Sequence, residues 1–335
     1  MLPHINLFYP SCIPSTPMKK YAASIDDVRA AAERIKGIGH RTPVLTSKTL
    51  NQLAGRELFF KCENFQKIGA FKFRGGWNAV SMLSEEEAKK GVCTHSSGNH
   101  AQAVAYSAQK RGIPAYIVMP NNSPDVKINA VKGYDANVTL CKPTLDARRT
   151  TLEKIASETG AAVIHPFNNP NVIAGQGTAA LEMIEDIGEL DAMIAPIGGG
   201  GLMSGTCITT RSLLPNAKLF GAEPKGADDA YRSLKEGVLL PQENPDTICD
   251  GLLTSLGENT WEILKDHLDS IYTVSDDEVI KAMKLIWERM KIIIEPSCAT
   301  PFAVVMSPEF KQLEGIEKIG IILTGGNIDL SNLPF

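Results

Sequence analysis

A lysine flanked by two aromatic residues is the first group in this sequence suited to covalent chemistry. Lys72 lies between Phe71 and Phe73 in the stretch GAFKFRGG. In an extended segment the two phenylalanines would share one face and Lys72 would point to the other. Desolvation would lower the pKa of its amine and suit it to Schiff-base formation. The alternative is a surface lysine whose ammonium stays in water.

Four consecutive glycines form a second candidate site. Gly198, Gly199, Gly200 and Gly201 follow an expected strand and open an expected helix. Glycines at that point let backbone N–H groups approach an anion, and the helix N-terminus adds positive potential. The alternative is a plain turn, although two glycines would suffice for one. Neither G-x-G-x-x-G nor G-K-[ST] is present, which argues against dinucleotide and Walker-type sites.

Two further polar stretches follow expected strands. Residues 96–100 read SSGNH and residues 324–327 read TGGN. In open parallel sheets, ligands bind outside the carboxyl ends of the strands. The alternatives are an ordinary helix N-cap for the first stretch and a turn for the second.

A cluster of acidic residues lies in the stretch AEPKGADD. Glu223, Asp228 and Asp229 supply carboxylate oxygens, which hard divalent cations prefer as ligands. The alternative, favoured by the spacing alone, is a solvated acidic loop.

Strand and helix patterns alternate along almost the whole chain. Helical spacing of apolar residues follows Ser24, and Ser275 with Glu278 forms a capping box. Apolar runs predict strands over 57–64, 92–94, 114–120, 136–141, 191–197, 218–224 and 318–323. The runs over 114–120 and 136–141 have the pattern of strands buried on both faces. This alternation predicts an α/β fold with parallel sheets covered by helices.

Composition limits the classes of partner. The 335 residues include 34 basic and 38 acidic side chains, a net charge of −4, and no basic stripe that would attract nucleic acid. No apolar run is long enough for a membrane span. Seven single, widely spaced cysteines indicate reduced thiols and a cytoplasmic protein rather than a disulfide framework or a zinc site. Residues 1–24 lack the pattern of a secretory signal and are expected to be a disordered extension.

Taken together, and in this order, the motifs GAFKFRG, SSGNH, GGGGL and TGGN resemble those of the fold-type-II pyridoxal-phosphate (PLP) enzymes. Within that family, the sequence is most similar to the eukaryotic serine racemases and the serine/threonine and threo-3-hydroxyaspartate dehydratases. The similarity runs from about residue 25 to the C-terminus and includes TPVLTS, FFKCENFQK, VIAGQGT, WERMK and IEP. It implies two open parallel-type sheets covered by helices, as in the tryptophan synthase β subunit. It also implies a small domain over 82–165 and a large domain over 25–81 plus 166–335.

The resemblance implies roles for residues of the cofactor site. Lys72 matches the lysine that bonds covalently to PLP, and Ser97 matches the racemase serine on the opposite face of the substrate. Asn99 matches the amide that hydrogen-bonds the phenolic oxygen of PLP, and Phe71 the residue packed beside the lysine. Thr324 matches the hydroxyl that faces the pyridine nitrogen, where serine is usual. The phosphate loop matches Gly198, Gly199, Gly200, Gly201 and Leu202.

Further sites are implied by the same resemblance. The family's magnesium or calcium site matches Glu223, the carbonyl of Ala227, and Asp229. This implication replaces the solvated acidic loop that the spacing alone favours. A site for an activating nucleotide such as ATP aligns with Ser47, Lys48, Thr49, Lys67 and Ile68. A homodimer is also expected. Phe167 stands where animal racemases have a polar asparagine, and Trp77 is large for its position.

The implied activity is racemisation of L-serine to D-serine, with elimination of water from serine to give pyruvate and ammonia. Two alternatives stay open: a serine/threonine or threo-3-hydroxyaspartate dehydratase with little racemisation, and a PLP-binding protein without turnover. Ser97 favours the racemase, because many plain dehydratases carry a smaller residue there.

Overall fold

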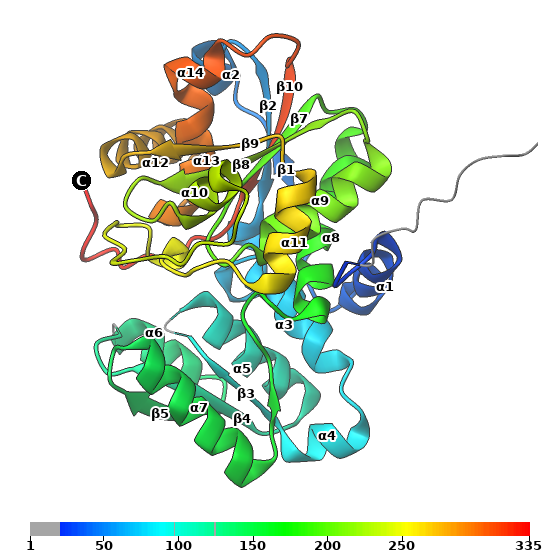
Figure 1. The fold of residues 1–335 in the computed structure, drawn as a ribbon, viewed down its shortest axis with the longest axis vertical. Helices are drawn as coiled ribbons and strands as arrows, with labels where there is room; N and C mark the ends of the chain where they lie inside the picture. Colours follow the sequence, from blue (N-terminus) through cyan, green and yellow to red (C-terminus); the bar gives the residue numbers. More distant parts are fainter. Residues whose placement is uncertain (1–20, 97, 124) are drawn as a thin grey trace, which may run out of the picture.

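The structure, a computed structural model, describes residues 21–96, 98–123 and 125–335. Two sheets dominate it, the larger in the upper part of Figure 1 and the smaller below. The larger sheet has the order β1-β2-β10-β7-β8-β9, and all its neighbouring strands are parallel except β1 and β2. Its strands are β1 (Val44–Leu45), β2 (Glu57–Cys62), β7 (Ala192–Pro196), β8 (Lys218–Pro224), β9 (Ser270–Val274) and β10 (Lys318–Leu323).

The smaller sheet is parallel throughout, with the order β5-β4-β3-β6. Its strands are β3 (Val92–His95), β4 (Ala115–Pro120), β5 (Asn137–Cys141) and β6 (Ala162–Val163). All four lie within the small domain expected over 82–165, although the exact domain boundaries stay a prediction.

Helices and three short 3-10 turns connect the strands. The helices are α1 (Ile25–Ile35), α2 (Lys48–Ala54), α3 (Lys72–Ser81), α4 (Glu85–Lys90), α5 (Asn99–Arg111), α6 (Asp125–Lys132), α7 (Leu145–Thr159), α8 (Pro170–Ile187), α9 (Gly201–Leu213), α10 (Asp229–Glu236), α11 (Glu258–His267), α12 (Asp276–Met290), α13 (Pro296–Met306) and α14 (Pro308–Lys311). The 3-10 turns are η1 (Glu63–Phe65), η2 (Lys67–Gly69) and η3 (Asp250–Leu252).

Apolar side chains bury both faces of the larger sheet. Along β10, Ile319, Ile321 and Leu323 pack in a core shared with α2, α12 and α13. Ile322 points the other way, into a core shared with α1, α8, α9 and α11. This alternation is the period-two pattern of a strand covered on both sides, and it explains the continuous apolar run over 318–323.

The predicted α/β fold with helix-covered parallel sheets is confirmed. The helix predicted after Ser24 and the capping box predicted at Ser275 are also present. The burial predicted for 136–141 is wrong, because β5 is an edge strand whose residues are exposed or half-buried. The extended backbone considered for the segment around Lys72 is likewise not found, since Lys72 begins α3. Most of the expected extension (1–20), and Cys12 and Ser97, lie outside the described residues.

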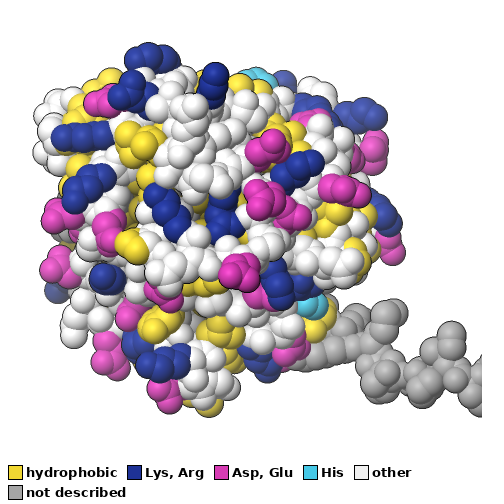
Figure 2. Space-filling view, turned by 90° about the horizontal axis from the view of Figure 1, so that it is seen from above, with side chains coloured by type: hydrophobic (Ala, Val, Ile, Leu, Met, Phe, Trp, Pro, Cys, Tyr) yellow, Lys and Arg dark blue, Asp and Glu magenta, His cyan; other side chains and the backbone are white. Residues whose placement is uncertain are grey.

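The surface mixes charges of both signs. Lysine and arginine side chains alternate with aspartate and glutamate over the face shown in Figure 2. None of the helices in the described ranges is both long and apolar enough to cross a bilayer.

Candidate active site

Three helices begin at predicted site residues. Lys72 is the first residue of α3, Asn99 of α5 and Gly201 of α9. Thr324 follows directly after β10. Strand ends and helix N-termini therefore supply the predicted groups, as expected for a ligand site at the carboxyl edge of parallel strands. In Figure 1, α3 lies between the two sheets.

The Lys72 amine is held in a low-dielectric setting. Its Nζ donates to the carbonyl oxygen of Pro166 at 2.9 Å and lies 5.2 Å from the ring centroid of Phe71. Burial lowers the pKa of Lys72 to about 8, against an opposing contribution from the Glu295 carboxyl. A fraction of the amine is therefore neutral and nucleophilic near physiological pH.

The end of β10 is joined to the segment that carries Lys72. The backbone N–H of Phe71 donates to the carbonyl oxygen of Thr324 at 2.9 Å, and Ala70 pairs with Gly325 in an antiparallel bridge. The Thr324 side chain is buried, and its Oγ1 has no hydrogen-bond partner among the described residues. A buried hydroxyl without a protein partner is free to hydrogen-bond a ligand.

The glycine loop between β7 and α9 fits closely under an aromatic ring. A Cβ at Gly199 would lie 2.1 Å from Cδ1 of Phe167, and one at Gly201 would lie 3.0 Å from the Phe167 Cα. Gly200 has φ +86°, in the left-handed region. Side chains are thus excluded for steric and conformational reasons, which leaves backbone N–H groups to line the loop ahead of the α9 N-terminus.

Asn99 lies in a chain of side-chain hydrogen bonds. Its Nδ2 donates to Oε1 of Glu295 at 2.8 Å, and its Oδ1 accepts from Nδ2 of Asn327 at 2.7 Å. Burial raises the pKa of Glu295 to about 8. Sequence analysis assigned no role to Glu295 or Asn327, although both stand in stretches singled out there, IEP and TGGN.

Two histidines near Lys72, His100 and His165, and a third beside His165, His95, are held neutral. Burial lowers the pKa of His165 to about 4, lowers that of His95, and lowers that of His100 well below its usual range. The positive charge of Lys72 lowers the pKa of His100 and His165 further. His165 also accepts from the Asn168 N–H through Nδ1 at 3.0 Å. These imidazoles therefore shape the site without adding positive charge.

These features fit PLP. The glycine loop suits the phosphate, the unpartnered Thr324 hydroxyl suits the pyridine nitrogen, and Asn99 retains a second amide hydrogen for the phenolic oxygen. The Lys72 amine suits the aldehyde carbon.

The two residues that differ from the family pattern, Phe167 and Trp77, lie in different parts of the structure. Phe167 lies at the site, against the glycine loop and edge-on to His165 with 4.6 Å between ring centroids. Trp77 packs away from it, with Nε1 donating to the carbonyl of Arg34 at 2.7 Å and its ring stacked on Phe73. Of these two differences from the family pattern, only Phe167 therefore affects the shape of this site.

Two of the predicted metal residues lie at the start of α10. Asp229 is its first residue, and Glu223, in β8, accepts from the N–H groups of Ala230 and Tyr231 in its first turn. Glu223 and Asp229 are both fully buried, so the solvated acidic loop favoured by the spacing is wrong. Oδ1 of Asp229 has no hydrogen-bond partner among the described residues. Burial and the Asp229 charge raise the pKa of Glu223 well above its usual range, and burial raises that of Asp229 to about 6. Two buried carboxyls and an unpartnered oxygen fit a hard divalent cation.

The residues aligned with a nucleotide site come from two segments. Ser47 caps α2, where its hydroxyl accepts from the Leu50 N–H, and the exposed Lys48 and Thr49 follow it. Lys67 and Ile68 lie in η2, where Ile68 has the left-handed backbone φ 59°, ψ 11°.

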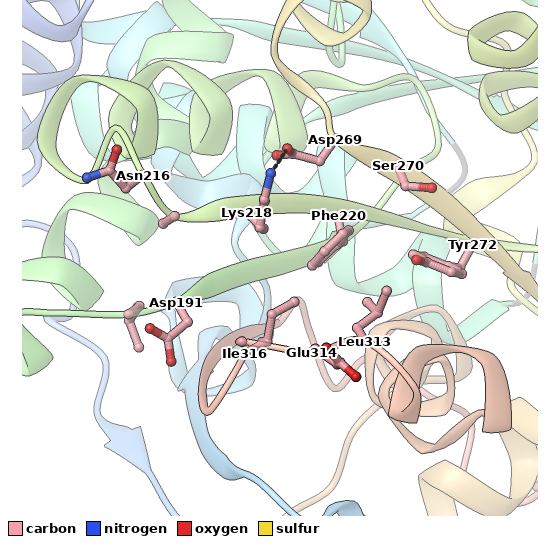
Figure 3. A pocket seen from close by; sticks show the side chains of 13 residues that line it. Asp191, Asn216, Lys218, Phe220, Asp269, Ser270, Tyr272, Leu313, Glu314 and Ile316 are labelled. Atoms are coloured by element: carbon pink, nitrogen blue, oxygen red, sulfur yellow. Dashed lines mark hydrogen bonds and ion pairs between the residues drawn. The ribbon is translucent and has the colours of Figure 1, made fainter.

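A surface hollow of about 480 Å³ lies elsewhere (Figure 3). Asp191, Lys218, Asp269 and Ile316 line it, with Phe220 and Tyr272 between them. Asp191, Lys218, Asp269 and Ile316 lie at the amino ends of β7, β8, β9 and β10, opposite the carboxyl end of β10 that precedes Thr324. The hollow is therefore separate from the candidate active site.

The glycine loop after β7 and the hydroxyl after β10 both come from the larger sheet, and the Phe71–Thr324 bond brings the Lys72 segment to the same edge. This is the arrangement that a PLP-dependent enzyme requires. A family model described as "Pyridoxal-phosphate dependent enzyme" matches residues 35–325, and the chain belongs to this family.

The serine racemase of Dictyostelium discoideum is 53% identical over 92% of this chain and 96% of its own length. The beta-hydroxyaspartate dehydratase of Paracoccus denitrificans is 49% identical over 94% of this chain and 99% of its own. The solved structure of maize serine racemase has a TM-score of 0.92 at 44% identity, covering 93% of this chain and 95% of that one.

Proposed function

We propose that this protein binds PLP at Lys72 and interconverts L-serine and D-serine, with loss of water from serine as a second outcome. The observation that carries the proposal is the buried, unpartnered hydroxyl of Thr324 beside the lysine segment. A neutral hydroxyl opposite the pyridine nitrogen, rather than a carboxylate, leaves that nitrogen less protonated. This favours racemisation and elimination over transamination.

When bound, PLP draws electrons from the substrate and makes its Cα–H bond acidic. The glycine loop and Asn99 orient the cofactor by hydrogen bonds to its phosphate and phenolic oxygen. The Lys72 amine, once displaced by the substrate, removes the Cα proton as a general base, a role that suits its lowered pKa.

The fate of that proton decides the product. Return of a proton on the opposite face inverts the centre, and the resemblance gives this role to Ser97. In elimination, the substrate's β-hydroxyl takes up a proton and leaves as water. The released unsaturated amine then hydrolyses to pyruvate and ammonia.

Product analysis tests the proposal. The holoprotein incubated with L-serine should form both D-serine and pyruvate, measured by chiral chromatography and a keto-acid assay. Ser97→Ala should lose racemisation and keep elimination. Full racemisation by that variant would exclude Ser97 as the second proton donor.

The alternative activity is dehydration of serine, threonine or threo-3-hydroxyaspartate. Two observations support this alternative: the similarity to the Paracoccus dehydratase, and the apolar Phe167 at the site. Comparing keto-acid formation from the three substrates distinguishes the two activities, since a plain dehydratase yields no D-serine.

We also propose a magnesium or calcium ion at Glu223, the Ala227 carbonyl and Asp229. The unpartnered Oδ1 of Asp229 supports it. Activation by ATP at the α2 and η2 segments and a homodimer are proposed from the resemblance, and a cytoplasmic location is proposed from the single, widely spaced cysteines. Activity measured with and without ATP and magnesium tests the two ligands. Size-exclusion chromatography tests the homodimer, and cell fractionation tests the location.

A further inference from the structure

One side chain, Asn327, joins the segment before Lys72 to the amide of Asn99. Its Nδ2 donates to the carbonyl oxygen of Ile68 at 2.7 Å and to Oδ1 of Asn99 at 2.7 Å. Both hydrogens of this amide nitrogen are therefore used, one toward each segment. Asn327 stands at the end of the TGGN stretch, three residues beyond Thr324.

The Ile68 carbonyl sets the direction of this hydrogen-bond chain. A backbone carbonyl only accepts, so the nitrogen of the Asn327 amide must face it. That nitrogen also faces Asn99, which must then present its oxygen. The Asn99 nitrogen is consequently turned to Oε1 of Glu295, at 2.8 Å, with one hydrogen left over. Burial raises the pKa of Glu295 to about 8, and its protonated carboxyl can donate as well as accept. Without the Ile68–Asn327 bond, either orientation of the Asn99 amide could therefore be hydrogen-bonded.

The backbone that supplies this carbonyl is strained. Ile68 is β-branched and has φ 59°, ψ 11°. Such a residue rarely occupies the left-handed region, and strain of this kind persists only where surrounding contacts impose it. Those contacts are the bond from Asn327 and, at the next residue, Gly69 N–H to Gln66 O at 2.9 Å and Gly326 N–H to Gly69 O at 3.0 Å.

Gly69 leaves room for the Asn327 side chain. A Cβ at Gly69 would lie 2.7 Å from Oδ1 of Asn327, and Gly69 itself has φ +70°. The local backbone is therefore shaped around the asparagine amide, and any larger residue at 69 would displace it.

We propose that Asn327 is a positioning residue that fixes the amide orientation of Asn99, so that an N–H of Asn99 faces the phenolic oxygen of bound PLP. This inference rests on the proposed function, because it concerns how the cofactor is held. Asn327 touches neither substrate nor cofactor in this role and acts only through Asn99.

The holoprotein tests the inference with Asn327→Asp and Asn327→Ala. Aspartate keeps the shape but cannot donate, and alanine removes the donors without adding charge beside Glu295. Asn332→Asp, the same chemical change at an exposed position nearby, is the matched control. Thermal unfolding of each apoprotein reports whether the variant folds.

Two spectroscopic measurements serve as readouts. Both Asn327 variants should weaken PLP binding on the order of tenfold, the effect of one lost hydrogen bond. Both should also shift the visible band of the bound cofactor to shorter wavelength, because the phenolate form loses a donor. Asn332→Asp should do neither.

A double-mutant cycle shows whether Asn327 acts through Asn99. In an Asn99→Ala background, Asn327→Ala should cost almost no further PLP affinity. Equal losses in both backgrounds, or an unshifted visible band in folded Asn327 variants, would overturn the positioning role. Wild-type protein that forms no visible band with PLP and does not turn over L-serine would instead overturn the proposed function.

Discussion

The backbone N–H of Phe71 donates to the carbonyl oxygen of Thr324 at 2.9 Å, although the two residues lie far apart in the chain. This bond sets the residue before Lys72 against the end of β10, where the Thr324 hydroxyl is buried. The start of α3, which carries the amine, and the end of β10, which carries the hydroxyl, are therefore held against each other, as precise placement of a cofactor ring requires.

Lys72→Ala should abolish covalent cofactor binding and lower turnover of L-serine by at least about a thousandfold, because it removes both the bonding amine and the general base. The visible band of the holoprotein and the rate of D-serine formation are the measurements. Lys110→Ala, an exposed lysine on α5, is the control and should match wild type. A visible band that survives in Lys72→Ala would show that another lysine holds the cofactor.

The rate at which apoprotein captures PLP should rise with pH and level off above about 8. Burial lowers the pKa of Lys72 to about 8, and only the neutral amine attacks the aldehyde. Below that pH the neutral fraction falls about tenfold per unit, to about a tenth at pH 7. Stopped-flow absorbance against pH measures the rate. A rate that keeps rising past pH 10 would mean that the amine has an ordinary lysine pKa.

Thr324→Val should have opposite effects on stability and activity. Without cofactor it removes a buried hydroxyl that has no partner, so the apoprotein should gain about 1 kcal/mol in unfolding free energy. With PLP, loss of the contact to the pyridine nitrogen should slow turnover on the order of tenfold. Thr324→Ser keeps the hydroxyl and should retain activity. Denaturant unfolding and steady-state kinetics measure the two effects, and a less stable Thr324→Val apoprotein would argue against an unsatisfied hydroxyl.

The elements and the glycine loop could be predicted from the sequence because their signals are local. Apolar periodicity marks strands such as 318–323, and consecutive glycines at 198–201 mark a loop that must exclude side chains. The exposure of 136–141 could not be predicted, because an apolar run does not show whether its strand lies at the centre or at the edge of a sheet. The topology places β5 at an edge.

Some site features depend on contacts between distant segments. The start of α3 at Lys72 follows from packing against α5 and α8, which overrides the alternation of Phe71 and Phe73. The burial of Glu223 and Asp229 likewise depends on the surrounding fold, and their spacing alone favoured a solvated loop. Asn327 was overlooked because its partners, Ile68 and Asn99, are brought to it only by tertiary structure.

Gly199→Ala should destabilise the protein by about 1–3 kcal/mol and weaken PLP binding, because the new Cβ overlaps the Phe167 ring. Adding Phe167→Ala should restore most of the lost stability, since the ring is then absent. The stability of Phe167→Ala alone is the reference, because it measures the cost of the cavity that loss of the ring leaves. Thermal unfolding and PLP titration are the measurements, and a double variant no more stable than Gly199→Ala would show that the ring is not the obstacle.

Asp229→Asn should remove the response of the protein to divalent cations. Glu223 and Asp229 are buried acidic neighbours, and the negative charge of Asp229 raises the pKa of Glu223. A cation that binds only the folded protein should stabilise it by about 3 kcal/mol at a hundredfold excess over its dissociation constant. The asparagine variant should lose that gain and be more stable than wild type in chelator, because one uncompensated buried charge is gone.

Asp228→Asn is the matched control for the cation site. The Asp228 side chain is about one-third exposed and pairs with Arg232 at 2.8 Å, so its loss should leave the cation response intact. Thermal unfolding with magnesium, with calcium and with chelator measures the response of each variant. A wild-type protein with the same unfolding temperature in all three conditions would show that the two carboxyls hold no cation. An unchanged response in Asp229→Asn would place the cation elsewhere, because this variant removes the charge of the carboxyl whose Oδ1 has no partner among the described residues.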